Sequence, residues 1–204
     1  MYTHKDFYLV TLIGTLVGAL VLIPAGNLGI AVTWPFAVLS IVGFALFAPC
    51  ALFVLKFLSR RWKVFEQFGK FAAVGTLNTL LDLGVLNGLM LATGVAGGLA
   101  FSGFKAVSFI VGTTNSYFWN KLWTFQNRVP VSAREYLVFA LFTLCGALIN
   151  VGVASVIVNV IGSPAGVSES AWANIGALLA VAASFLWNFL SYRFIVFKRP
   201  EPSA

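Results

Sequence analysis

Long apolar runs separated by short polar connections dominate the chain. Six of them are long enough to cross a bilayer, which takes about 20 residues per helical crossing. They cover residues 7–30, 34–58, 68–92, 101–123, 136–160 and 172–194. In the first, the apolar stretch from Phe7 to Ile23 is longer than the ~7–15 apolar residues of a signal peptide, so we expect an uncleaved helix. The pattern predicts an all-α, polytopic integral membrane protein with six transmembrane helices.

Composition agrees with this pattern. Hydrophobic residues make up 60% of the 204 positions, charged residues only 9%, and the mean hydropathy is +0.94. Soluble domains are about half apolar and a quarter charged. Six spans leave no length for a sizeable soluble domain, so any function must take place in or beside the bilayer.

Basic residues gather at alternate ends of the runs. Of the 13 Lys and Arg residues, all but Lys105 lie before the first run, around the connection between the second and third, around the connection between the fourth and fifth, or near the end of the sixth. The opposite connections, around 24–34, 93–101 and 161–171, contain neither Lys nor Arg. The positive-inside rule therefore predicts a multi-pass protein of the cell (inner, cytoplasmic) membrane with both termini in the cytoplasm. Anionic lipid headgroups account for the net charge of +7, so we expect no nucleic-acid partner.

Signals for a catalytic or metal centre are missing from the sequence. Cys50 and Cys145 lie inside apolar runs without paired spacing, and His4 is the single histidine. No nucleophile–base set, zinc motif or glycine-rich phosphate loop occurs. We therefore expect no enzyme activity, no metal and no cofactor.

The last four runs form an internal repeat of a two-helix unit. A shift of 68 places Phe71, Gly75, Asn78 and Asp82 on Phe139, Thr143, Gly146 and Asn150, and a shift of 72 places Ser116, Lys121 and Phe125 on Asn188, Arg193 and Phe197. Each unit crosses twice, so the two copies are parallel repeats, an arrangement that favours a binding site at their interface.

The repeat suggests three segments. We assign 1–65 to an N-terminal transmembrane hairpin with a basic cytoplasmic linker, 66–199 to the duplicated four-helix core and 200–204 to a tail. Gly14 and Gly18 have the small-xxx-small spacing of a closely packed helix face, whose partner the sequence does not name.

Two opposite charges are expected at the same depth in the first repeat. Asp82 lies 82−68 = 14 residues after Phe68, and Lys105 lies 120−105 = 15 residues before Asn120. At ~1.5 Å per residue these offsets are about 21 and 22 Å. We predict that the two side chains form an ion pair within the first hairpin. The pair could fix helix register or serve as a polar station for sugar hydroxyls or phosphate, and Lys105 could instead snorkel to the outer interface.

Further polar residues extend this station. Asn78 lies one helical turn from Asp82 on a face expected to point inward. Asn115 and Asn150 would join the lining if they face the same cavity. Lys121 and Arg193, at equivalent helix ends, are either ordinary interfacial charges among lipid phosphates or a pair of cationic gates, and Lys70 is expected to add positive charge at this entrance.

Two segments resemble the GtrA-like family of polytopic membrane proteins: "FGKFAAVGTLNTLLDLGVLNGL" at 68–89 and "NSYFWNKLWTFQNR" at 115–128. The family's entry pattern FxxVGxxNTxxD matches at Phe71, Val74, Gly75, Asn78, Thr79 and Asp82, and its exit pattern NxxxNRxWTF matches at Asn120, Trp123, Thr124 and Phe125. Lys121 stands where Arg is common, and Ser116 where Asn is common. The resemblance covers roughly 66–199 and leaves the first hairpin unexplained.

The resemblance implies translocation of polyprenyl-phosphate-linked sugars, such as undecaprenyl-phosphate glucose, for glycosylation of cell-surface polysaccharide. The candidate substrate-binding residues are Asn78, Asp82, Lys105, Asn115, Asn120, Lys121, Asn150, Asn188 and Arg193. Expected partners are the lipid-linked sugar and membrane lipids, with a membrane glycosyltransferase and a second copy of the chain left open. Two alternatives remain: a non-transporting adaptor that recruits a glycosyltransferase, and a small proton-coupled exporter that uses Asp82.

Overall fold

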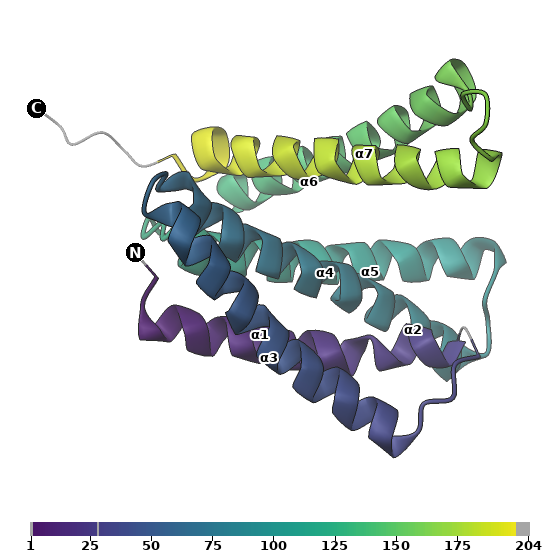
Figure 1. Ribbon diagram of the computed structural model, residues 1–204, viewed down its shortest axis with the longest axis horizontal. Helices are drawn as coiled ribbons and strands as arrows, with labels where there is room; N and C mark the ends of the chain where they lie inside the picture. The colour runs from purple at the N-terminus through teal and green to yellow at the C-terminus, as the bar shows by residue number, and fades with distance from the viewer. Residues whose placement is uncertain (1, 28, 199–204) are drawn as a thin grey trace, which may run out of the picture. The chain divides into compact units, whose positions relative to one another are not determined.

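The computed structural model describes residues 2–27 and 29–198, and their regular structure is entirely helical (Figure 1). The helices are α1 (His4–Leu20), α2 (Leu22–Asn27), α3 (Trp34–Ser59), α4 (Val64–Thr93), α5 (Gly98–Trp119), α6 (Ala133–Ser155) and α7 (Glu169–Ser191). Three wider π-helical turns, η1 (Asn120–Thr124), η2 (Val156–Ile161) and η3 (Tyr192–Val196), continue α5, α6 and α7. Each of the six predicted runs therefore forms a helix.

Five helical segments of the described chain are long and apolar enough to cross a membrane: His4–Gly26, Trp34–Ser59, Val64–Thr93, Ala133–Ile161 and Trp172–Val196. The sixth long helix, α5, falls outside this set. It carries Lys105 and an unbroken polar run from Thr113 to Ser116, which lower its hydropathy. The expected all-α polytopic membrane fold is confirmed, and α5 packs against α4 in the first repeat.

Local sequence explains where several helices begin and end. The Thr3 hydroxyl accepts from the Asp6 N–H at 3.3 Å and the Asp6 carboxylate accepts from the Thr3 N–H at 2.8 Å, a capping box that starts α1. Ser132 caps α6 by accepting from the Glu135 N–H. Gly94, with φ of 68°, ends α4 in the left-handed conformation that glycine adopts without a steric penalty.

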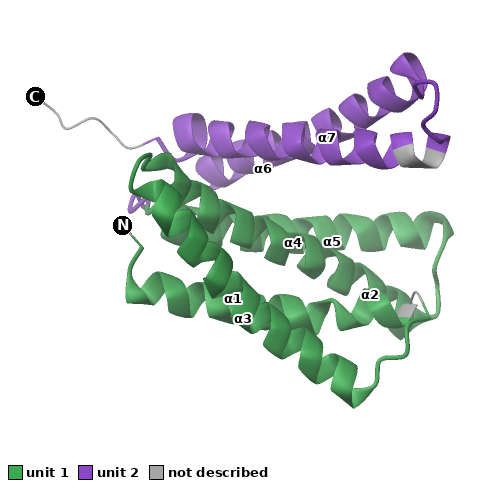
Figure 2. Cartoon of the chain, in the orientation of Figure 1, with its two compact units in different colours: residues 1–126 green, residues 127–204 purple. Residues whose placement is uncertain are grey.

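The chain divides into two compact units, residues 1–126 and 127–204 (Figure 2). Unit 1 holds the N-terminal hairpin together with the first repeat, and unit 2 holds the second repeat. The division thus cuts the predicted core, 66–199, between its two copies. The predicted tail, 200–204, lies outside the described residues.

The core of unit 1 lies where α1 packs against α3 and α4. Val10, Ile13 and Val17 of α1 are buried there with Leu52 of α3 and Val74 of α4. The close approach of α1 to α3 depends on glycines. A Cβ on Gly14 would lie 2.9 Å from the Cβ of Ala48, and one on Gly18 would lie 2.6 Å from the Cα of Ile41. The small-residue face therefore packs within the chain, against α3.

A buried ion pair joins the N-terminal hairpin to the first repeat. Lys70 Nζ of α4 lies 2.7 Å from Asp6 Oδ1 of α1, and the two side chains are 2% and 6% exposed. The indole N–H of Trp123, in η1, donates to the same carboxylate at 2.8 Å. Lys70 Nζ also lies 5.7 Å from the Trp123 ring centroid and 5.9 Å from that of Tyr2, distances typical of cation–π contacts. We call Asp6, Lys70 and Trp123 the anchor cluster.

The anchor cluster corrects our expectation for Lys70. Instead of adding charge to an open entrance, its ammonium is buried and neutralised by Asp6. Tyr2 covers the cluster, and its hydroxyl donates to the Phe65 carbonyl at 2.8 Å. Burial, with the nearby carboxylates of Glu66 and Asp6, raises the pKa of Tyr2, so the hydroxyl keeps its proton and remains a donor.

We expect Gly14→Ala to lower the free energy of unfolding in detergent micelles by about 1–3 kcal/mol, because the added methyl group meets the backbone of α3. Gly43→Ala is the matched control, since it lies within α3 and a Cβ there has nothing within 4 Å. Equal effects of the two substitutions would contradict the close α1–α3 contact.

Lys70→Met should cost about 3–5 kcal/mol, because it leaves the Asp6 carboxylate buried without its counter-ion. Adding Asp6→Asn should recover part of this loss. Lys63→Met, at an exposed position, serves as control and should change stability by less than about 0.5 kcal/mol. Chemical unfolding in micelles measures the free energy of unfolding of the native chain, Lys70→Met, the Asp6→Asn/Lys70→Met double variant and Lys63→Met. A double variant as unstable as Lys70→Met would argue against direct pairing.

Candidate functional site

Polar side chains form a line along the contact between α4 and α5, which we call the α4–α5 seam: Asn78, Asp82, Lys105, Ser108 and Asn115. The ammonium of Lys105 forms an ion pair with Oδ2 of Asp82, and the Ser108 hydroxyl donates to Oδ1 at 2.6 Å. The pairing predicted from equal depth is confirmed. Ser108 was not predicted, although it lies three residues after Lys105, on the same face of α5.

One turn along the hairpin, two amides continue the seam. Asn115 Nδ2 donates to Asn78 Oδ1 at 2.8 Å, and Asn78 Nδ2 donates to the Val74 carbonyl at 2.8 Å. Between the amides and the ion pair lies Gly112, where a Cβ would be 3.7 Å from both the Asn78 carbonyl oxygen and the Asp82 Cβ. The small residue brings the two backbones close enough for short side chains to bond across the interface.

The ion pair of the seam is open, unlike the anchor cluster. The Lys105 side chain is 47% exposed and that of Asp82 is 24% exposed. Charged groups inside a membrane protein usually face a partner or a polar pathway, because hydrocarbon solvates them poorly. The Asp82–Lys105 pair satisfies both groups and still leaves them within reach of a polar ligand.

Unit 2 repeats the register of the seam with different side chains. Asn150, at 82+68, donates to the Ser184 hydroxyl at 3.5 Å, and Ser184 stands at 112+72. Gly146, at 78+68, faces Asn188, at 116+72, whose Cγ would lie 2.8 Å from an added Cβ. The two hairpins therefore pair in the same register, as the internal repeat predicts. At the place of Lys105 the second copy has Ala177, so it carries no equivalent ion pair.

The segments that follow α5 and α7, residues 120–125 and 192–197, share an unusual backbone. The N–H of Phe125 bonds to the carbonyl of Asn120 at 2.8 Å, and the N–H of Phe197 bonds to that of Tyr192 at the same distance, 72 residues on. Such i+5 turns are rare and often mark functional positions. In each hairpin the final Phe meets an aromatic ring at the start of the partner helix, Phe71 with Phe125 at 6.5 Å and Phe139 with Phe197 at 5.8 Å between centroids.

The segments 120–125 and 192–197 differ in their polar contacts. In unit 2 the Tyr192 hydroxyl bonds to the Thr143 hydroxyl at 2.6 Å, and its ring stacks on Phe139 at 4.3 Å. The equivalent positions of unit 1 are Gly75 and Asn120. Oδ1 of Asn120 is buried without a hydrogen-bond partner within the described chain. Unit 1 therefore keeps an unmatched polar atom at the site that an aromatic side chain fills in unit 2.

The remaining predicted residues are not among the bonded residues of the seam. Lys121, expected at a lipid-facing helix end, is instead buried, with 1% exposure, in η1. Arg193 is half-buried, its guanidinium lies 5.3 Å from the Phe194 ring centroid, and its Nη1 is buried without a hydrogen bond. Oδ1 of Asn188 is likewise buried without a partner. The structure thus brings four of the nine candidates into one seam: Asn78, Asp82, Lys105 and Asn115.

Double-mutant cycles should separate the two ion pairs by their exposure. We expect a coupling energy of about 0.2–1 kcal/mol between Asp82 and Lys105, the range of partly exposed pairs. The coupling between Asp6 and Lys70 should be at least twice as large, because that pair is sealed from solvent. Unfolding free energies of the Asp82→Asn, Lys105→Met and double variants measure the first term. A larger coupling in the seam than in the anchor cluster would show that the seam is closed.

Comparison with known proteins identifies the family of the segment that contains both hairpins. The family model described as "GtrA/DPMS, transmembrane domain" matches residues 70–197, from the anchor-cluster Lys70 to the final Phe of the second copy. The uncharacterized membrane protein YngA of Bacillus subtilis (strain 168) is 29% identical over 92 residues, which are 45% of this chain and 58% of that relative. No solved structure matches the chain. Because the family model covers more than half of the residues and both hairpins, the chain belongs to the GtrA/DPMS transmembrane-domain family.

Proposed function

We propose that the protein moves a polyprenyl-phosphate-linked sugar, such as undecaprenyl-phosphate glucose, from the cytoplasmic to the outer leaflet of the cytoplasmic membrane, for glycosylation of cell-surface polysaccharide. Family membership supports the class of function. The observation that carries the proposal is the Asp82–Lys105 ion pair, which stays partly exposed between two mostly apolar helices.

The chemistry of the seam suits the headgroup of such a lipid. A sugar phosphate loses its water when it enters hydrocarbon, and each unpaired polar group then costs several kcal/mol. The Asp82 carboxylate can accept from sugar hydroxyls, and the Lys105 ammonium can donate to phosphate oxygens. Because the two residues neutralise each other when the site is empty, a headgroup can exchange one set of ionic contacts for another without leaving a bare charge.

The polar groups of unit 1 form steps along one helix pair. Asn120 lies at the end of α5, the Asn78–Asn115 contact about 15 Å from the start of the apolar run at Phe68, and Asp82–Lys105 about 21 Å from it. With both termini in the cytoplasm, as the basic residues favour, these steps lead from the inner leaflet past the middle of the bilayer. Lys121, Arg193, Asn150 and Asn188 are proposed to contact the headgroup at further points, and the unpaired Nη1 of Arg193 supports an anion-binding role.

The test is leaflet exchange of a labelled undecaprenyl-phosphate sugar in liposomes that contain the purified protein. We expect the native chain to accelerate exchange and Asp82→Asn to reduce the acceleration at least tenfold, because the amide cannot neutralise Lys105. Glu169→Gln makes the same chemical change at an exposed position outside the seam and should leave exchange unchanged. A labelled phosphatidylethanolamine in the same liposomes controls for leakage and general scrambling.

One result would count against translocation, and two others would change its proposed mechanism. If the folded native protein gives no acceleration, a role as an adaptor for a membrane glycosyltransferase becomes the better account, and capture of that enzyme by the purified chain would test it. If exchange occurs only with an imposed pH gradient and Asp82→Asn abolishes that dependence alone, proton coupling belongs to the mechanism. Equal exchange by native protein and Asp82→Asn would remove the seam from the pathway.

A further inference from the structure

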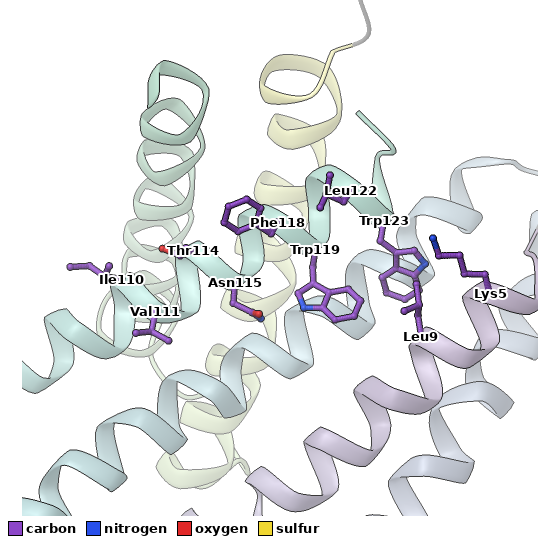
Figure 3. Close-up of a pocket in the computed structure, with 10 residues that line it drawn as sticks. All are labelled: Lys5, Leu9, Ile110, Val111, Thr114, Asn115, Phe118, Trp119, Leu122 and Trp123. Atoms are coloured by element: carbon purple, nitrogen blue, oxygen red, sulfur yellow. The ribbon is translucent and has the colours of Figure 1, made fainter. Parts of the chain in front are cut away.

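A groove runs between α1 and α5 within unit 1, with a volume of about 700 Å³ (Figure 3). Both helices pack against α4, which holds them on either side of the groove. One wall belongs to the N-terminal hairpin, which lies outside the family match at 70–197. We call this space the α1–α5 groove.

The walls of the groove are mostly hydrocarbon. Leu9 lines it from α1, and Ile110, Val111 and Phe118 line it from α5 (Figure 3). Its lining spans residues 110 to 123 of α5 and η1, which corresponds to about 20 Å at ~1.5 Å per residue. This length reaches from one end of the helix pair to beyond the middle of a ~30 Å hydrocarbon layer. The groove therefore fits an extended apolar chain that enters from one leaflet.

A cation stands at the cytoplasmic end of the groove. Lys5 is exposed, and within the described chain it has neither an ion pair nor a hydrogen bond, unlike Lys70 and Lys105. Beside it the rings of Trp119 and Trp123 lie 5.6 Å apart, and the indole N–H of Trp123 is held by Asp6. One apolar slot beneath one uncommitted ammonium matches an amphiphile with a single chain and an anionic head.

The groove also adjoins the seam. Asn115 lines the groove, and its amide donates to Asn78 at 2.8 Å. A lipid chain lying against α5 would therefore touch one end of the seam at Asn115, while most of its contacts stay apolar.

We propose that the α1–α5 groove binds the isoprenoid chain of an anionic polyprenyl phosphate and that Lys5 binds its phosphate at the cytoplasmic end; this inference rests on the proposed function. A polyprenyl phosphate places one branched chain beneath one anionic head. A two-chain phospholipid must leave one chain outside the groove. The N-terminal hairpin then has a definite role, as the second wall of a lipid-binding site.

A diazirine-bearing polyprenyl phosphate, photolysed with the full chain in liposomes, tests the site. Mass spectrometry of the adducts should place them on the groove-lining segments of α1 and α5. Val111→Trp, which fills the groove, should reduce labelling at least fivefold. Val107→Trp is the matched control, because Val107 lies on the same helix, is similarly exposed at 47% against 38%, and is not part of the lining.

Binding of the lipid phosphate by Lys5 is tested separately. Lys5→Gln should weaken labelling about threefold or more, while Lys63→Gln, at another exposed lysine that does not line the groove, should leave it unchanged. Unlabelled polyprenyl phosphate should compete, and phosphatidylglycerol at the same concentration should not. Equal labelling of the two tryptophan variants, adducts on other helices, or equal competition by phosphatidylglycerol would overturn the proposal, the last identifying an ordinary lipid contact.

Leaflet exchange distinguishes failure of this inference from failure of the proposed function. Labelling confined to the groove in a protein that gives no exchange would support the binding site and refute translocation. Exchange by a protein whose adducts lie elsewhere would refute the groove as the binding site and leave translocation standing.

Discussion

Hydrocarbon offers no hydrogen bonds, so each polar group that a membrane helix carries must find its partner within the protein. The described chain meets this constraint in two ways. In the anchor cluster the charges of Asp6 and Lys70 are enclosed and serve to hold α1 against α4. In the α4–α5 seam the charges of Asp82 and Lys105 are paired but accessible. The same interaction is structural in one place and available for ligand chemistry in the other, and exposure makes the difference.

The two repeated hairpins have the same backbone arrangement but different side chains. Both pair their helices in one register and end in a π-helical turn followed by Phe. The second copy fills its ending with the stacked ring of Tyr192, bonded to Thr143, whereas the first has Gly75 and Asn120 there. Polar and charged groups are thus concentrated in the first copy, which is also the copy that the N-terminal hairpin covers.

Much of this organisation could be predicted from the sequence, because membrane spans, positive charge bias and repeats are local or periodic signals. The Asp82–Lys105 pair followed from counting residues along two antiparallel helices. The Asp6–Lys70 pair did not, because it depends on how α1 packs, and charge bias alone placed Lys70 at an open surface. Ser108 and Gly112 could have been found from the i, i+3, i+7, i+10 stripe of Lys105, Ser108, Gly112 and Asn115 on α5. The groove could not, since it is defined by the distance between two helices that no local pattern encodes.

The anchor cluster also constrains the order in which the chain can mature. During synthesis Asp6 emerges 70−6 = 64 residues before Lys70 and 117 residues before Trp123. Until those residues are made, the carboxylate has only its capping contacts with Thr3. The first helix can therefore enter the bilayer early, but its N-terminal end reaches its final position only after Trp123, in the turn that follows α5, has been made. The packing of α1 is therefore completed only when residue 123 of the 204 has been added to the chain.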